Sequence, residues 1–214
     1  MRLNALVPAA LLLVVVSVPS FAQDWMEYAS RQDFFSVNFP GQPAIRSITY
    51  ATEYGLSVPA RVYSVEDGSG TYLVTVVDYS GAEKLHTERA ARCRADGGDG
   101  DSCNNPGRAD VRGAIVHASF DFIRRGAEMT HFANYNADLV EGIRLQLVNT
   151  DGSRTFAVIH MHEYRLFILE GTVARGQPPP ALFQQSLGFL DKDGNRIRYE
   201  TTYSHGYPVP RRTR

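Results

Sequence analysis

Two histidines, His160 and His162, carry the clearest chemical signal in the chain, because a single methionine separates them. On a strand, residues two positions apart project from the same face, so both imidazoles are placed to bind one zinc ion. With Glu163, His131 or His117 as a further ligand and an open water position, such a site is typical of a hydrolase. The alternative is that both histidines occupy the solvent-facing side of a strand that ends at a hairpin, with His162 already turning away. We favour this alternative and expect no tightly held metal, because the fold must still supply a further ligand.

His117 and Asp121 form a second pair with chemical potential, since they are four residues apart in a segment expected to be helical. A carboxylate in that position is placed to orient the imidazole ring of a general base. The chain contains no Gly-x-Ser-x-Gly nucleophile motif, and the Gly-Ser-Gly segment at 68–70 is typical of a loop. We therefore interpret the pair as a surface contact on a helix and predict no catalytic residues.

Acidic residues gather in one glycine-rich segment, at Asp96, Asp99 and Asp101. The segment resembles one fragment of a calcium-binding repeat, but Ser102 stands where an aspartate is required and no second copy follows. The run 191–195 likewise has its glycine in the fourth place, whereas an EF-hand loop has it in the sixth. Both segments are more simply turns, and a weak extracellular calcium site at the first of them is the alternative.

The start of the chain resembles a secretory leader. Arg2 precedes an apolar run at 9–18, and Ser20-Phe21-Ala22 offers small residues to a signal peptidase. The apolar run is much shorter than the roughly 20 residues that span a bilayer. We therefore predict a leader at 1–22, a mature chain that begins at Gln23 without a transmembrane segment, and a periplasmic or secreted location.

Cys93 and Cys103 are the only cysteines in the 214 residues. In an exported protein, two cysteines this close together are expected to form a disulfide, which leaves no free thiol for catalysis. The formal net charge of −1 argues against a nucleic-acid partner, because phosphate binding requires clustered positive charge.

The elements that must position these residues are mostly strands. In the stretch 138–175, apolar residues alternate with polar ones and Asp151-Gly152 supplies a tight turn, so three consecutive strands are expected to form an antiparallel meander. Further strands are predicted at 25–28, 34–39, 46–51, 60–65, 71–79, 128–135 and 196–202. The strand at 71–79 is the most apolar of the N-terminal half and is expected to be central in the sheet.

Two helices are expected to cover this sheet. Asp110 is placed to cap the first, whose apolar residues repeat with helical spacing at Val111, Ala114, Ile115, Ala118 and Phe122. The second opens at Pro180 and continues through Leu182, Phe183, Leu187, Phe189 and Leu190. The segment 81–113 is charged and then glycine-rich, which predicts a short helix and a surface excursion tied by the disulfide. The segment 203–214 has no apolar periodicity, so we expect a disordered basic tail.

The order of motifs along the chain carries further information. Trp-x-x-Tyr from Trp25 and Phe-Ser-Val-x-Phe-Pro-Gly-x-Pro from Phe35 precede the strands, the helix and the meander, and Phe-x-x-Ser-Leu from Phe183 follows them. This order resembles the PsbP-like family of bacterial envelope proteins, which share a fold with the extrinsic PsbP subunit of photosystem II and with a Ran-binding nuclear import factor. The resemblance covers about Trp25 to Leu190. It implies a non-catalytic accessory or docking protein, with no active-site residues to carry over.

Together these patterns predict one α+β domain at 23–202, with an antiparallel sheet of about seven to nine strands and two main helices packed against it. We expect an exported, non-catalytic accessory or interaction protein of the cell envelope, with an envelope protein as its partner and no cofactor. Its binding surface is expected on loops, above all on the loop with Asp96, Asp99 and Asp101, because loops on a rigid sheet carry most recognition. The alternatives are a metal-dependent hydrolase that uses His160 and His162, and a periplasmic carrier of a small apolar ligand.

Overall fold

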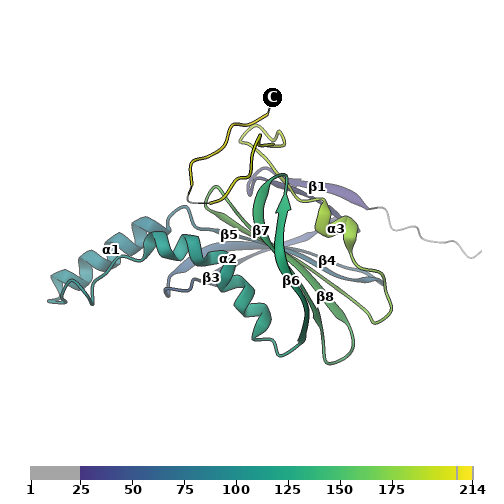
Figure 1. Ribbon diagram of the computed structural model, residues 1–214, viewed down its shortest axis with the longest axis horizontal. Coiled ribbons are helices and arrows are strands. Elements are labelled where there is room, and N and C mark those ends of the chain that lie inside the picture. Colours follow the sequence, from purple (N-terminus) through teal and green to yellow (C-terminus); the bar gives the residue numbers. More distant parts are fainter. Residues whose placement is uncertain (1–24, 206, 214) are drawn as a thin grey trace, which may run out of the picture.

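The computed structural model describes residues 25–205 and 207–213 and shows an α+β fold that is mostly sheet (Figure 1). Its main element is a seven-stranded antiparallel sheet in the order β3-β4-β5-β9-β8-β7-β6. The strands are β3 (Ala44–Ala51), β4 (Ser57–Glu66), β5 (Gly70–Asp78), β6 (Glu128–Ala137), β7 (Val140–Val148), β8 (Arg154–His162) and β9 (Arg165–Val173). The α+β class and the antiparallel sheet are confirmed, whereas the predicted leader at 1–22 lies outside the described residues.

The meander predicted at 138–175 is present as β7, β8 and β9, which are neighbours in the sheet. Gly152 closes the first turn with a positive φ of 81°, and its N–H donates to the carbonyl oxygen of Asn149 at 2.9 Å. Glu163 and Tyr164 form the second turn and both have positive φ, which suits the right-handed twist of a two-residue hairpin. The apolar strand β5 lies between β4 and β9 inside the sheet, as its composition predicts.

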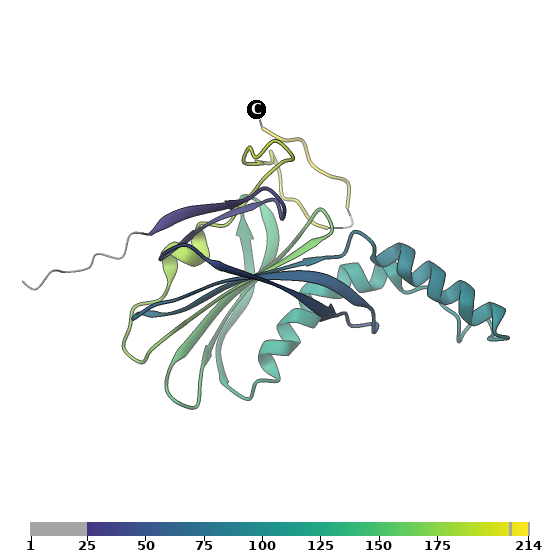
Figure 2. The same ribbon diagram turned by 180° about the vertical axis from the view of Figure 1, so that it is seen from behind.

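A small second sheet covers one face of the main sheet. It consists of β1 (Met26–Ser30), β2 (Phe35–Phe39) and β10 (Gly188–Phe189), in the order β1-β2-β10. Figure 2 shows the purple β1–β2 hairpin beside the short helix α3 (Ala181–Gln185). Together they bury an aromatic layer against the main sheet, with Phe35, Phe39, Phe183 and Phe189 fully enclosed.

The second predicted helix is shorter than expected. It ends at Gln185, and Gly188 and Phe189 pair with Ser36 and Phe35 as a strand. Leu187, Phe189 and Leu190 are buried, but a short apolar run is compatible with a buried helix or a buried strand, so hydrophobicity alone does not distinguish the two. The apolar pattern located four of its five core residues, since Leu182 is 49% exposed, but it did not give the type of element.

The opposite face of the main sheet is covered by α2 (Gly107–Ile123). Its buried residues include Val111, Ala114, Ala118 and Phe122, which are four of the five residues in the predicted stripe. Asp110 does not cap this helix as expected. The helix begins three residues earlier, and the carboxylate of Asp110 is buried beneath it.

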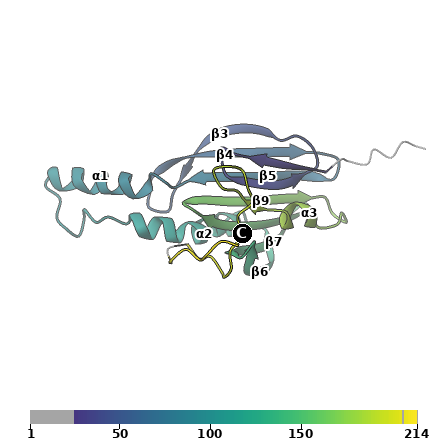
Figure 3. The same ribbon diagram turned by 90° about the horizontal axis from the view of Figure 1, so that it is seen from above.

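The helix α1 (Ala82–Ala95) and the start of α2 form a projection that we call the helical arm, residues 82–112. Figures 1 and 3 show the arm extending well past one end of the strands, so α1 does not pack on the sheet as a main helix. The predicted short helix is present as α1, and the excursion that follows it is the loop 96–106, which leads into α2. Cys93 and Cys103 lie near its tip and form the expected disulfide, with a Cα–Cα distance of 5.5 Å.

Replacing both cysteines by serine is expected to lower the free energy of unfolding by at most about 3 kcal/mol, because the bond closes a loop of only about ten residues. The sheet should keep its structure, since the bond joins α1 to the loop before α2 and involves no strand. Urea unfolding followed by circular dichroism, with the oxidised protein as reference, measures the difference. Loss of the strand signal in the double variant would contradict this expectation.

The C-terminal segment differs from the disordered tail expected at 203–214. Tyr203 is buried, and its N–H donates to the carbonyl oxygen of Leu139 at 2.8 Å. Farther on, Thr213 N–H donates to the carbonyl oxygen of Arg198. The predicted strand at 196–202 is reduced to isolated bridges at Arg196 and Tyr199. Aromatic burial thus orders a segment whose composition alone suggested disorder. Among the described residues, no helix combines the length and the apolar character needed to cross a membrane.

Candidate functional site

The two histidines of the His-x-His pair lie on the same face of β8, with both rings in the interior. His160 is 0% exposed and His162 is 2% exposed. The ring centres of Phe189 and Tyr203 lie 4.5 and 4.9 Å from that of His162, so β10 and the C-terminal segment cover this face. The expectation that the pair occupies a solvent-facing side is therefore wrong.

Both histidines are held by hydrogen bonds within the core. Nδ1 of His160 lies 3.2 Å from the carbonyl oxygen of Glu141, and Nε2 of His162 lies 2.7 Å from the hydroxyl of Tyr199. Gly142 is required opposite His160, because a Cβ at that position would collide with the imidazole. Burial lowers the pKa of His160 to about 4 and that of His162 to about 3. At neutral pH the pair is therefore an uncharged part of the core.

The structure does not bring the remaining zinc candidates to this pair. Glu163 lies in the turn after β8 and pairs with Arg212, while His131 lies on β6 and His117 on α2. Within the residues that the structure describes, no group of three or more His, Cys, Asp or Glu side chains is placed to hold a metal ion. The geometry thus gives no support to the hydrolase alternative.

His117 and Asp121 are both on α2, but their side chains have other partners. Nε2 of His117 lies 3.3 Å from the carbonyl oxygen of Ala51, and Asp121 forms an ion pair with Arg124. The ring and the carboxylate are therefore not arranged as a general base with its orienting group.

The acidic segments have the hydrogen bonds of turns. Oδ1 of Asp99 accepts from the N–H of Ser102 at 2.8 Å, and Asp96 and Asp101 are exposed at the tip of the arm. In the run 191–195, Oδ1 of Asp191 accepts from two backbone N–H groups at 2.9 Å. The carboxylates of Asp99 and Asp191 therefore stabilise their own loops.

A buried polar network at the base of the arm was not anticipated. Oδ2 of Asp110 accepts from the hydroxyl of Thr52 at 2.6 Å and lies 2.8 Å from Nε2 of His86. These three residues come from the β3–β4 loop, α1 and α2, and each is at most 4% exposed. The network ties the arm to the sheet. Its members are far apart in the sequence, so no spacing pattern could have revealed it.

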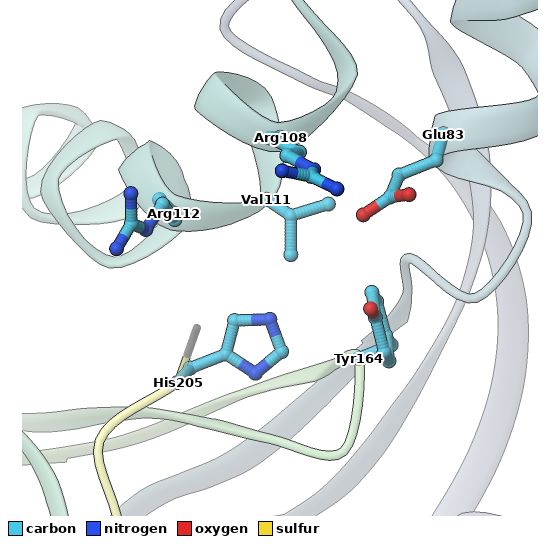
Figure 4. A pocket seen from close by; sticks show the side chains of 6 residues that line it. All are labelled: Glu83, Arg108, Val111, Arg112, Tyr164 and His205. Atoms are coloured by element: carbon cyan, nitrogen blue, oxygen red, sulfur yellow. The ribbon is translucent and has the colours of Figure 1, made fainter. Parts of the chain in front are cut away.

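A polar cavity of about 500 Å³ lies beside this network, where the arm meets the turn after β8 and the C-terminal segment (Figure 4). It is lined by Glu83, Arg108, Val111, Arg112, Tyr164 and His205. In Figure 4 the guanidinium of Arg108 points toward the Glu83 carboxylate, and the rings of Tyr164 and His205 face them from the other side.

The charges of the cavity are unbalanced. The lining includes two arginines and one carboxylate, and neither Arg108 nor Arg112 forms an ion pair within the described part of the chain. Burial lowers the pKa of His205, with Glu83 acting in the opposite direction. The imidazole therefore serves mainly as a neutral hydrogen-bonding group, and the positive charge of the cavity comes from the arginines.

A second hollow, of about 470 Å³, runs between α2 and the strands β6 and β7. We call it the α2–β6 groove; its lining residues are Arg112, Ile115, Val116, Asn134, Asn136, Glu141, Gly142 and Ile143. Its floor is the α2 side of the sheet, because Asn134 pairs with Ile143 across β6 and β7. Sequence reasoning missed this groove, since α2 was expected to bury its only apolar stripe.

No family model matches the chain, and no curated protein matches it either. The PsbP-like resemblance of the motif order therefore stays a prediction.

Proposed function

We propose that the protein is an exported, non-catalytic interaction protein of the cell envelope, and that it binds an envelope protein through the α2–β6 groove. The observation that carries this proposal is a set of exposed apolar side chains, three on the helix α2 and one on the strand β6. Val116 is 53% exposed, Phe120 50% and Ile123 44% on the helix, and Phe132 is 50% exposed on the strand. Apolar patches left exposed by a folded domain mark interaction surfaces.

The exposed residues form a second stripe on α2. Val116, Phe120 and Ile123 follow one another at intervals of four and three residues, so they lie on one side of the helix. Phe132 lies on the α2 side of β6, because its cross-strand partner Leu145 belongs to the core beneath α2. Val116 itself lines the α2–β6 groove, and Phe132 lies on the side of the sheet that forms the floor of the groove.

The edge strand β6 indicates the conformation of the partner segment that would bind here. β6 is the last strand of the sheet, and none of the described strands pairs with its outer side. An unpaired edge is a template for an added strand, and such a strand points every second side chain to one face of the sheet. We therefore propose an extended partner segment with apolar residues at alternate positions, which pack against Phe132 and the exposed stripe of α2.

The other functional alternatives have less support. The cavity at the base of the arm is lined mainly by charged and polar side chains, which does not suit a carrier of a small apolar ligand. The tip of the arm is a second candidate surface for docking, because it projects from the domain and exposes Asp96 and Asp101.

Replacing Phe132 by Asn is expected to reduce recovery of the partner at least about tenfold, because truncating a hot-spot residue of an interface costs about 2 kcal/mol or more of binding energy. The measurement is crosslinking in the native envelope, followed by quantification of the captured protein. Leu182→Asn is the matched control, since Leu182 is 49% exposed but lies on α3. A photoreactive residue at position 120 should capture the same protein, and one at position 182 should not.

Capture only from position 101 would move the docking surface to the tip of the arm and overturn the groove. Unchanged recovery with both Phe132→Asn and Phe120→Ser would do the same. Turnover of a substrate that is lost on replacing His160 would overturn the non-catalytic assignment.

A further inference from the structure

We infer that the cavity at the base of the helical arm is a binding site for an oxyanion, the carboxylate or phosphate group of a small molecule. The inference goes beyond the docking function, because the cavity is lined mainly by charged and polar side chains and not by the exposed apolar stripe, although Arg112 borders both hollows. It rests on the arrangement of two arginines without ion-pair partners around an open, polar space.

The arginines are the first part of the argument. Arg108 and Arg112 are four residues apart on α2, so their side chains leave the helix on the same side. Like charges at this spacing destabilise a helix by a few tenths of a kcal/mol, so the pair is not explained by the stability of α2. A guanidinium presents several N–H donors in a planar fork that matches carboxylate and phosphate oxygens.

The other lining residues supply hydrogen bonds without cancelling the charge. The ring centres of Tyr164 and His205 are 5.0 Å apart and nearly perpendicular, and they face the arginines across the cavity. Nδ1 of His205 lies 3.4 Å from the hydroxyl of Tyr203, which fixes the orientation of the imidazole. Glu83 is the only carboxylate among the lining residues, so it limits the affinity for an anion but leaves an excess of positive charge.

The size and polarity of the cavity restrict the ligand. A volume of about 500 Å³ falls in the range of small-molecule sites. Only Val111 among the lining residues is aliphatic, so a ligand with a large apolar body gains little there. A compact, polar anion fits best.

The test uses citrate as the carboxylate probe and inorganic pyrophosphate as the phosphate probe, titrated into the full-length exported protein by calorimetry. We expect at least one of them to bind with a dissociation constant below about 1 mM. Arg108→Gln and Arg112→Gln should each weaken binding about tenfold, because each removes a charge-assisted contact. Glu83→Gln should strengthen it several-fold, because a repelling carboxylate is removed. Arg92→Gln is the matched control, since Arg92 is exposed on α1 away from the cavity.

Binding of citrate alone would assign a carboxylate ligand, and binding of pyrophosphate alone a phosphate ligand. Failure of both probes, or equal losses with Arg92→Gln and Arg108→Gln, would overturn the inference. Thermal unfolding of each variant establishes that the fold is retained. None of these outcomes depends on capture of a protein partner, so the two proposals can fail separately.

Discussion

Acidification from pH 7 to pH 4 is expected to lower the free energy of unfolding by about 3 kcal/mol for each of His160 and His162. Burial holds the pKa of these two residues at about 4 and about 3 in the folded protein. In the unfolded chain both should titrate near the usual value of about 6.5. Because native domains are stable by only about 5–15 kcal/mol, this loss is large enough to unfold the protein.

The sign follows from which state binds the protons. Between the unfolded and folded pKa values, the unfolded chain is protonated at both histidines while the folded core keeps them neutral. The stabilisation is therefore complete above about pH 6.5 and is lost as the pH falls toward 4. Nearby Arg212 acts in the same direction as burial at His162, since its positive charge opposes protonation of the ring.

Urea unfolding at a series of pH values measures this loss directly. The double variant His160→Gln, His162→Gln should be less stable at pH 7 but should show a much flatter dependence between pH 6.5 and 4. His117→Gln is the control, because that half-exposed ring lies on α2 outside this core. An equally steep loss of stability in the double variant would show that other groups cause the acid sensitivity.

The sequence was most informative where one residue pattern determines one contact. The alternation in β7, β8 and β9 and the stripe Val111, Ala114, Ala118 and Phe122 on α2 required only local periodicity, and the structure contains both. The interior position of β5 followed from its apolar composition in the same way.

Prediction failed where burial depends on a layer contributed by a distant segment. The outward assignment of His160 and His162 assumed that one face of β8 meets solvent, but β10 and Tyr203 cover it. Tyr203 itself was assigned to a disordered tail, since a lone aromatic among polar residues carries no periodicity. The two errors are linked. The histidines are buried only because the C-terminal segment covers them, and Tyr203 is ordered only because it packs on that face of β8.

The candidate site was beyond local patterns for the same reason. The oxyanion cavity combines Glu83, Arg108, Arg112, Tyr164 and His205, which come from four separate segments of the chain. In the sequence alone, Arg108 and Arg112 look like ordinary charged residues on the surface of a helix. Only the arrangement of the arm, the turn after β8 and the C-terminal segment places them around a common space.

Replacing Asp110 by Ala is expected to lower the free energy of unfolding by about 3–5 kcal/mol. This is the usual cost of removing one partner from a buried salt bridge, and Asp110 is paired with His86. The side chains of Thr52 and His86 would both lose the acceptor that they share, and both are buried too deeply for water to replace it. Asp121→Ala on the same helix is the matched control, because its ion pair with Arg124 is exposed and should contribute less than about 1 kcal/mol.

Hydrogen exchange should show where the stability is lost. Outside the loops, the arm meets the domain through α2 and the Asp110 network, so the amides of α1 should lose protection before those of the central strands. Thr52→Val removes only one hydrogen bond and should give the same pattern at a cost of about 1 kcal/mol, which keeps the test valid if Asp110→Ala does not fold. Equal loss of protection in α1 and in β5 would mean that the arm and the sheet unfold as one unit. Because Arg108 and Arg112 flank Asp110 on α2, selective opening of the arm would also separate Glu83 from them, and the oxyanion cavity would be lost while the sheet stayed folded.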